Sequence, residues 1–259
     1  MGVEDARPRR RASPGGCEKI VKGFLLAAGV GTRLRPLTDA IPKCLAPIQG
    51  VPLLAIWLEW CAMYGIDEIL LNSHAHHERV GEFIDAYRGP VRVTLTREPE
   101  LLGSAGTLKV NREFVAGEKE FAVLYADVLT NCRFDRLLDF HRIRHAPVTL
   151  GTYRVPNPTQ CGIIATDDSG KVVDFVEKPQ FPKSEQAFSG ILIGGPALLA
   201  HLPERVPADI GFDVLPKLVG EMFAFPIADY VFDIGTMEKY EQAQREWPGL
   251  AGTSRIHNG

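Results

Sequence analysis

The chain has 259 residues, 45% of them hydrophobic, and can bury a sizeable core as one large α/β domain or two closely packed lobes. Its formal net charge of −3 argues against a nucleic-acid-binding protein, which usually presents a basic face. The sequence contains neither an apolar stretch of about eighteen residues nor the apolar core of a secretory signal after its N-terminal arginines. These features predict a cytoplasmic protein that binds neither nucleic acid nor membranes.

Residues 1–18 combine a basic cluster, Pro8 to Arg11, with proline, glycine and serine, which predicts a disordered basic tail. The five cysteines are odd in number and lack C-x-x-C spacing, so we expect buried or partly buried thiols rather than a disulfide framework or a thiolate zinc site. They are Cys17, Cys44, Cys61, Cys132 and Cys161.

The first predicted strand runs from Val21 to Ala28, because a continuous apolar run is typical of a buried parallel strand. Gly29 and Gly31 follow it, and glycines let a backbone turn sharply and approach a ligand closely. The exposed N–H groups of such a turn bind anions, and Arg33 and Lys43 add two full positive charges. This segment therefore suits a nucleoside triphosphate.

Two other phosphate-binding motifs are excluded at this turn. The dinucleotide fingerprint G-x-G-x-x-G requires a third glycine where this chain has Leu34, which also argues against a nicotinamide-dependent oxidoreductase. The P-loop requires lysine and a hydroxyl residue directly after a glycine, and neither is present in that frame.

Helices and strands then alternate, which predicts a doubly wound, mainly parallel sheet with helices on both faces. Ligands of such sheets lie at the carboxyl ends of strands, where Gly29 and Asp127 both fall. The predicted elements are a helix from Pro52 to Tyr64 ended by Gly65, a strand from Glu68 to Asn72, a helix from Glu78 to Tyr87, a strand from Val91 to Thr96, a helix beginning near Gly106 and a strand from Phe121 to Tyr125.

From about Val148 the pattern changes to shorter strands, which predicts a smaller, partly antiparallel lobe. The strands are expected over 148–154, 162–166 and 171–177, with a hairpin turn at 167–170. Helices are expected over 196–201, 213–220 and 236–246, and the chain from Pro248 is expected to fray.

Three histidines, His74, His76 and His77, form a run after one of these strands. Neighbouring side chains on a strand point to opposite faces, so they cannot easily face one ion. The run is therefore not interpreted as a zinc site.

The segment from Gly29 to Lys43 resembles the signature of the sugar-1-phosphate nucleotidyltransferases, G-x-G-T-R-L-x-P-L-T followed by P-K. The resemblance extends along almost the whole chain. Its further motifs are LLGSAGTL from Leu101, YADVLT from Tyr125, VEKP from Val176, FSGILI from Phe188, FDVLPKLV from Phe212 and FDIGTMEKY from Phe232.

The resemblance implies a Rossmann-like, glycosyltransferase-A-like catalytic domain over residues 19–247. Its nucleotide-binding half would span about 19–147 and its sugar-binding half about 148–247, with a flexible tail over 248–259. The implied reaction joins a nucleoside triphosphate to a sugar 1-phosphate and gives a nucleotide sugar and pyrophosphate, with Mg²⁺ as cofactor. A homo-oligomer is possible on the same basis.

The resemblance also implies roles for individual residues. The catalytic residues would be Arg33, Lys43, Asp127 and Lys178, and the metal ligands Asp127 and Asp233. The nucleotide would contact Leu26, Ala27, Gly29, Gly31, Thr32, Arg33, Gly103, Gly106 and Thr107. The sugar phosphate would contact Gly162, Glu177, Lys178 and Ser189. One departure is Ala126, where the family commonly has glycine.

Two motifs bear on specificity. LLGSAGTL is similar to the guanylyltransferases that act on mannose 1-phosphate, which favours GTP and leaves thymidylyl, uridylyl and cytidylyl transfer as alternatives. Phe188 replaces a polar residue that contacts the sugar in the family, which suggests an altered sugar such as a deoxy sugar, a heptose or a cyclitol. A non-catalytic nucleotide-sugar sensor is a further alternative, disfavoured because Arg33, Lys43 and Lys178 are intact.

Overall fold

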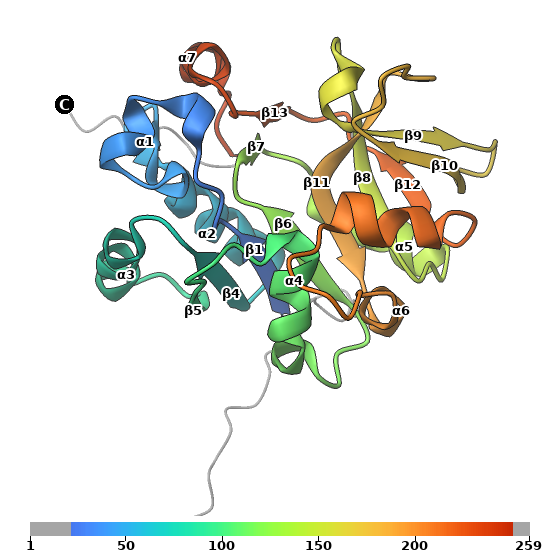
Figure 1. Cartoon of the computed structure of the whole chain (residues 1–259), viewed down its shortest axis with the longest axis horizontal. Coiled ribbons are helices and arrows are strands. Elements are labelled where there is room, and N and C mark those ends of the chain that lie inside the picture. The colour runs from blue at the N-terminus through green and yellow to red at the C-terminus, as the bar shows by residue number, and fades with distance from the viewer. Residues whose placement is uncertain (1–21, 251–259) are drawn as a thin grey trace, which may run out of the picture.

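A computed structural model describes residues 22–250 of the protein. Figure 1 shows a central sheet with helices in front of it and behind it, and the strands β8, β9, β10 and β12 at one side. The tail expected over 1–18, Cys17 and the segment 251–259 lie outside the described residues.

The core of the fold is a nine-stranded sheet in which β10, β9, β11, β6, β1, β4 and β5 follow one another in that order. The four strands β5, β4, β1 and β6 are parallel, with Leu26 of β1 level with Asn72 of β4 and Tyr125 of β6. Their bounds are β1 Lys22–Leu26, β4 Glu68–Ser73, β5 Arg92–Arg97 and β6 Phe121–Tyr125. The predicted mainly parallel, doubly wound sheet is confirmed.

The remaining strands join this sheet through β11, Gln186–Gly194. One edge of β11 pairs with β8, and its other edge pairs with β9 at Ala187 and with β6 from Ile191 to Gly194. The expected partly antiparallel part is therefore continuous with the parallel strands. The other strands are β8 Thr149–Arg154, β9 Gly162–Thr166, β10 Val172–Glu177 and β12 Phe223–Pro226.

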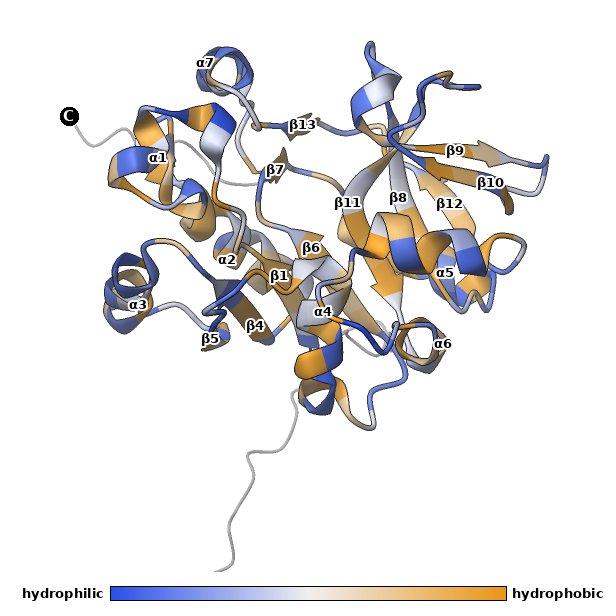
Figure 2. Cartoon of the chain, in the orientation of Figure 1, coloured by the Kyte–Doolittle hydropathy of each residue, from blue (hydrophilic) through white to orange (hydrophobic). Residues whose placement is uncertain are grey.

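Side chains alternate between the two faces of the sheet, and each face has its own core. Leu25, Ile69 and Leu124 pack under α2 and α5, while Phe24, Leu70 and Val123 pack against α4 and the residues that follow Ala208. The helices are α2 Leu53–Tyr64, α3 His77–Ala86, α4 Gly103–Val110, α5 Phe134–Ile143 and α6 Pro196–Ala200. Figure 2 shows hydrophobic colours along β1 and β4 and hydrophilic colours over much of α3 and α7.

Short elements fasten the loops at the carboxyl ends of the strands. The β7–β13 ladder pairs Val128–Thr130 with Val231–Asp233, and α7, Met237–Glu246, begins after Thr236, whose hydroxyl accepts a hydrogen bond from the Lys239 amide. The remaining short elements are α1 Leu37–Ala40, β2 Pro47–Ile48 and β3 Val51–Pro52.

Three predictions of local structure were wrong. Residues 213–220 do not form one α-helix; a π-turn over Ile210–Val214 leads into a 3₁₀ turn over Leu215–Leu218, and Pro216 supplies no N–H for a regular helix. α4 begins at Gly103 rather than near Gly106. The chain does not fray at Pro248, because Leu250 is buried in the core and the Gly249 carbonyl accepts a hydrogen bond from Asn131.

Two further features concern the class of protein. None of the helices described between residues 22 and 250 is long and apolar enough to span a membrane. Cys44, Cys61 and Cys132 are buried and Cys161 is partly buried, as expected, and burial raises the pKa of the Cys44 thiol to about 12.

Candidate active site

A pocket of about 390 Å³ lies at the carboxyl ends of β1, β4 and β6, within the usual size of small-molecule sites of roughly 300–1,000 Å³. Its walls come from the glycine loop (residues 27–33), the first turn of α4, residues 125–127 and Gly235. The predicted nucleotide residues Leu26, Ala27, Gly29, Gly31, Thr32, Arg33, Gly103 and Thr107 all line it, whereas Gly106 does not.

The glycine loop is held in a tight, fixed shape. Gly31 has a left-handed φ of 68°, and a Cβ there would lie 2.9 Å from Thr38 Cγ2, so only glycine fits without strain. The Thr38 hydroxyl donates to the Gly31 carbonyl at 2.8 Å, and His76 Nε2 lies 3.2 Å from the Thr38 carbonyl. Gly29 has open space on its side-chain side, so a ligand can approach the backbone there.

A buried lysine and an aspartate meet at the base of this pocket. Lys43 is only 9% exposed, and its ammonium donates to Asp127 Oδ2 at 2.9 Å. Burial alone would raise the pKa of Asp127, but the charge and hydrogen bond of Lys43, with a smaller effect from Arg33, hold it below its ordinary value. The Ala126 methyl replaces a family glycine without strain, because Ala126 has no positive φ.

The second predicted metal ligand, Asp233, lies beside the first although 106 positions separate them in the chain. In the β7–β13 ladder Asp233 pairs with Val128, and the Ile234 amide donates to the Asp127 carbonyl at 3.1 Å. Asp233 Oδ2 accepts a hydrogen bond from Lys239 at 2.7 Å. A Cβ on Gly235 would lie 2.9 Å from Asp233 Oδ1 and 3.3 Å from Arg33 Nη2, so the glycine keeps the carboxylate and the guanidinium close.

Sequence reasoning missed a buried polar network on the wall formed by β4, β5 and α4. Asn72 donates to Glu98 Oε1 at 2.8 Å and to the Thr107 hydroxyl at 3.0 Å, and its carbonyl accepts from the Ala27 amide at 2.6 Å. Glu98 is 2% exposed and also accepts from the Leu102 amide. The available signal was a polar residue at the end of each of two consecutive strands, Asn72 in β4 and Glu98 directly after β5.

The glycines of LLGSAGTL have a packing role in addition to any contact with a base. Gly103 has a φ of 73°, and a Cβ there would lie 2.3 Å from the Ala208 carbonyl oxygen. That oxygen accepts hydrogen bonds from the amides of Ala105 at 3.0 Å and Gly106 at 3.1 Å. The Gly106 N–H is therefore already used within the protein, which does not support its predicted backbone contact with the nucleobase.

The predicted sugar residues form a second cluster next to this pocket. The Glu177 carboxylate stands between two glycines, since a Cβ on Gly162 or Gly211 would lie 2.6 or 2.5 Å from its Oε2. Lys178 Nζ is 3.8 Å from Glu177 Oε1. Ser189, by contrast, is 2% exposed and its hydroxyl accepts from the Ile191 amide, which does not support a side-chain contact with the sugar.

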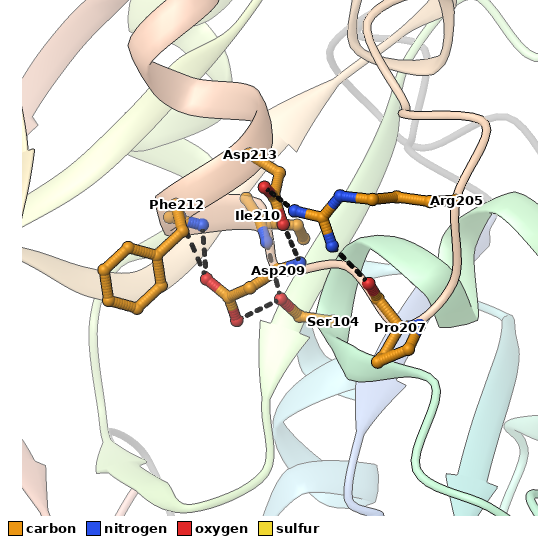
Figure 3. Close-up of polar contacts among 8 residues, drawn as sticks. Ser104, Arg205, Pro207, Asp209, Ile210, Phe212 and Asp213 are labelled. Carbon is orange, nitrogen blue, oxygen red and sulfur yellow. Dashed lines mark hydrogen bonds and ion pairs between the residues drawn. The ribbon is translucent and has the colours of Figure 1, made fainter.

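Asp209 lies between the pocket and the cluster around Glu177, and Figure 3 shows its hydrogen bonds to Ser104 and Phe212. Its Oδ2 accepts from the pocket-lining Ser104 hydroxyl at 2.8 Å, and its Oδ1 accepts from the amides of Gly211 and Phe212 at 2.8 and 3.1 Å. Burial raises the pKa of Glu177, and the nearby Asp209 charge also raises it, against the opposing effect of Lys178.

The three histidines have three separate partners. His74 Nδ1 donates to the Glu98 carbonyl at 2.7 Å, and His77 Nδ1 lies 2.7 Å from the Ser73 hydroxyl. His76 contacts the carbonyl of Thr38. The first and last of these histidines therefore anchor loops around the pocket, and His76 fastens the glycine loop.

A family model described as nucleotidyl transferase matches residues 22–248. The chain belongs to the nucleotidyl transferase family. The predicted resemblance is confirmed, because the match covers almost all of the described residues.

Relatives within this family act on different substrates. The chain is 35% identical over 243 residues to a UTP–glucose-1-phosphate uridylyltransferase of Synechocystis, covering 87% of this chain and 63% of the relative. It is 32% identical over 221 residues to a mannose-1-phosphate guanylyltransferase catalytic subunit beta of Danio rerio, covering 83% and 61%. The chain thus spans about three-fifths of the length of these relatives.

The fold matches that of a solved UDP-glucose pyrophosphorylase complexed with UDP-glucose, with a TM-score of 0.78 and 21% identity. The match covers 88% of this chain and 98% of that chain. It supports the α/β nucleotidyltransferase fold.

Proposed function

We propose that the protein transfers a nucleotidyl group from a nucleoside triphosphate to a sugar 1-phosphate, giving a nucleotide sugar and pyrophosphate. The observation that carries the proposal is the Lys43–Asp127 pair in the pocket beside the glycine loop, with Asp233 on the neighbouring strand. The reaction joins two anions, so it needs their negative charges neutralised and their reacting atoms aligned more than it needs a general base. Cations and carboxylates gathered at one pocket match these needs.

Each group has a distinct part in this reaction. The amides of the glycine loop and the Arg33 fork would hold the β- and γ-phosphates, and Lys43 would contact the phosphates as a point charge. Lys178 would hold the sugar 1-phosphate so that its oxygen attacks the α-phosphorus in line with the leaving pyrophosphate. Glu177 would accept a sugar hydroxyl.

Asp127 and Asp233 form a donor set that fits Mg²⁺, because two carboxylates leave the other positions of this hard ion to water and phosphate oxygens. When bound there, the ion would neutralise charge on the phosphates during transfer. In its absence Lys43 and Lys239 balance the two carboxylates.

We infer GTP as the preferred nucleotide and a mannose-like hexose, heptose or cyclitol 1-phosphate as the acceptor. The form of LLGSAGTL and the guanylyltransferase relatives support this choice. UTP with glucose 1-phosphate is a second candidate, favoured by the similarity to the Synechocystis uridylyltransferase.

The proposal is tested by pyrophosphate release from each of the common nucleoside triphosphates against a panel of sugar 1-phosphates, with and without Mg²⁺. We expect one pair to dominate and release to require the metal. Binding of a nucleotide sugar without any release would instead favour the non-catalytic sensor.

A further inference from the structure

Phe212 is a large apolar side chain at an unusual place. It is 56% exposed, yet it follows Gly211 directly, and Gly211 lies against the Glu177 carboxylate. Its backbone is fixed, since its amide donates to Asp209 Oδ1 at 3.1 Å. In Figure 3 the ring points away from Asp209 and stands clear of the polar cluster. An exposed aromatic ring on a fixed backbone beside a ligand pocket is a ready contact surface.

The face of this ring carries negative electrostatic potential that already attracts a cation. Lys178 Nζ lies 5.7 Å from the ring centroid and 3.8 Å from Glu177 Oε1. The ring and the carboxylate therefore both lie near the Lys178 ammonium. Glu177 Oε2 accepts no hydrogen bond from the residues described between 22 and 250, so it is available to a ligand donor.

We propose that Phe212 is a stacking platform for the sugar ring and thereby determines the acceptor specificity of the site. Carbons bonded to oxygen have polarised C–H bonds, and the C–H face of a pyranose ring is both apolar and slightly positive at its hydrogens. Such a face packs on an aromatic ring while hydroxyls at the ring edge reach a carboxylate. Phe212 would support the ring face, and Glu177 would accept an edge hydroxyl.

This arrangement also assigns Lys178 two positions. Without substrate its ammonium rests over the Phe212 ring; with substrate it turns to the phosphate of the sugar 1-phosphate and leaves the ring face to the sugar. The acceptor class that follows is a cyclic sugar phosphate with one continuous C–H face. The inference rests on the proposed function, because it takes the cluster around Glu177 as the sugar site.

The test compares the wild type with Phe212→Ala, Phe212→Leu and Phe212→Trp in steady-state kinetics. We expect Phe212→Ala to raise the KM for the sugar 1-phosphate by roughly 10-fold and to leave the KM for the nucleoside triphosphate unchanged. Phe212→Trp should keep the wild-type KM for the sugar 1-phosphate. Phe212→Leu should have an intermediate KM, because it keeps apolar area without a π face. Phe181→Ala removes an even more exposed ring, 87% exposed, and should change neither KM.

Inorganic phosphate as a competitive inhibitor separates stacking from an effect through Lys178. Its Ki should not rise in Phe212→Ala, because phosphate has no ring to stack. A Ki that rises in parallel with the sugar KM would overturn the proposal, as would an unchanged sugar KM.

Calorimetric titration of the sugar 1-phosphates into the wild type and Phe212→Ala keeps the two proposals distinct. Binding that weakens in Phe212→Ala without turnover in either protein would refute the proposed transfer reaction and still support the platform. Turnover by the wild type with equal sugar binding in both proteins would refute the platform alone. If the wild type neither binds nor converts any sugar phosphate, both proposals fail.

Discussion

Replacement of Gly103 by alanine tests the packing of α4 against the segment that carries Asp209. Gly103 has a left-handed φ of 73°, and its added Cβ would lie 2.3 Å from the Ala208 carbonyl oxygen and 2.9 Å from the carbonyl carbon. Both atoms belong to the backbone, so the contact cannot be relieved by a side-chain rotation. The two segments must separate in the variant.

The expected cost has two parts. A non-glycine residue in the left-handed region costs roughly 1–2 kcal/mol. Separation of the segments also weakens the hydrogen bonds from Ala105 and Gly106 to Ala208, each worth about 1 kcal/mol net. A loss of about 3 kcal/mol corresponds to a melting temperature about 6–12 °C lower for a domain of this size.

Thermal melting followed by circular dichroism, with Gly117→Ala as the matched control, checks this reasoning. Gly117 has a φ of 80° but open space around its Cβ position, so it should lose only the conformational part. If Gly103→Ala and Gly117→Ala melt at the same temperature, the close approach to Ala208 is refuted.

Four further outcomes are expected. Lys43→Met should lower kcat by roughly 10²- to 10³-fold in the pyrophosphate-release assay, and a loss of less than about 10-fold would contradict a role in the transition state. Chelation of divalent metal should stop release, Mg²⁺ should restore it, and Asp233→Asn should raise the Mg²⁺ concentration needed for half-maximal activity. Burial lowers the pKa of His141 below 6.5, so the unfolded chain takes up a proton at this group at a higher pH than the folded one. The melting temperature should therefore fall as the pH falls below 6.5, and it should fall less in His141→Gln. Asp209→Asn removes a charge that raises the pKa of Glu177, so tight sugar 1-phosphate binding should persist to lower pH, and an unchanged pH profile of its KM would count against their coupling.

The parallel part of the sheet was predictable because its strands and helices are local and strongly apolar. The run before Gly29 and the helix ended by Gly65 follow directly from burial and from the left-handed conformation that glycine adopts. The hairpin between β9 and β10 was also predictable, since Asp167 and Gly170 are typical turn residues.

The parts that sequence reasoning missed depend on contacts between distant segments. The pattern LLGSAGTL does not reveal that Gly103 and Gly106 face Ala208, so both glycines were assigned only to contacts with the nucleobase. The segment after Asp209 does not form the predicted α-helix, because the Asp209 carboxylate accepts hydrogen bonds from the successive amides of Gly211 and Phe212. Ser189 was assigned from its motif, and only the packing around β11 shows that its side chain is buried.

The strand β11 has a consequence for how the protein can adapt to its substrates. This one strand is hydrogen-bonded to β6 near one end and to β9 near the other, with a register shift between Phe188 and Leu192, so both clusters lie over one continuous sheet. A clam-like closing of one half upon the other would break this ladder. Adjustment to different sugars and bases is therefore confined to the loops above this sheet, where a few residues can change selectivity while the scaffold keeps its stability.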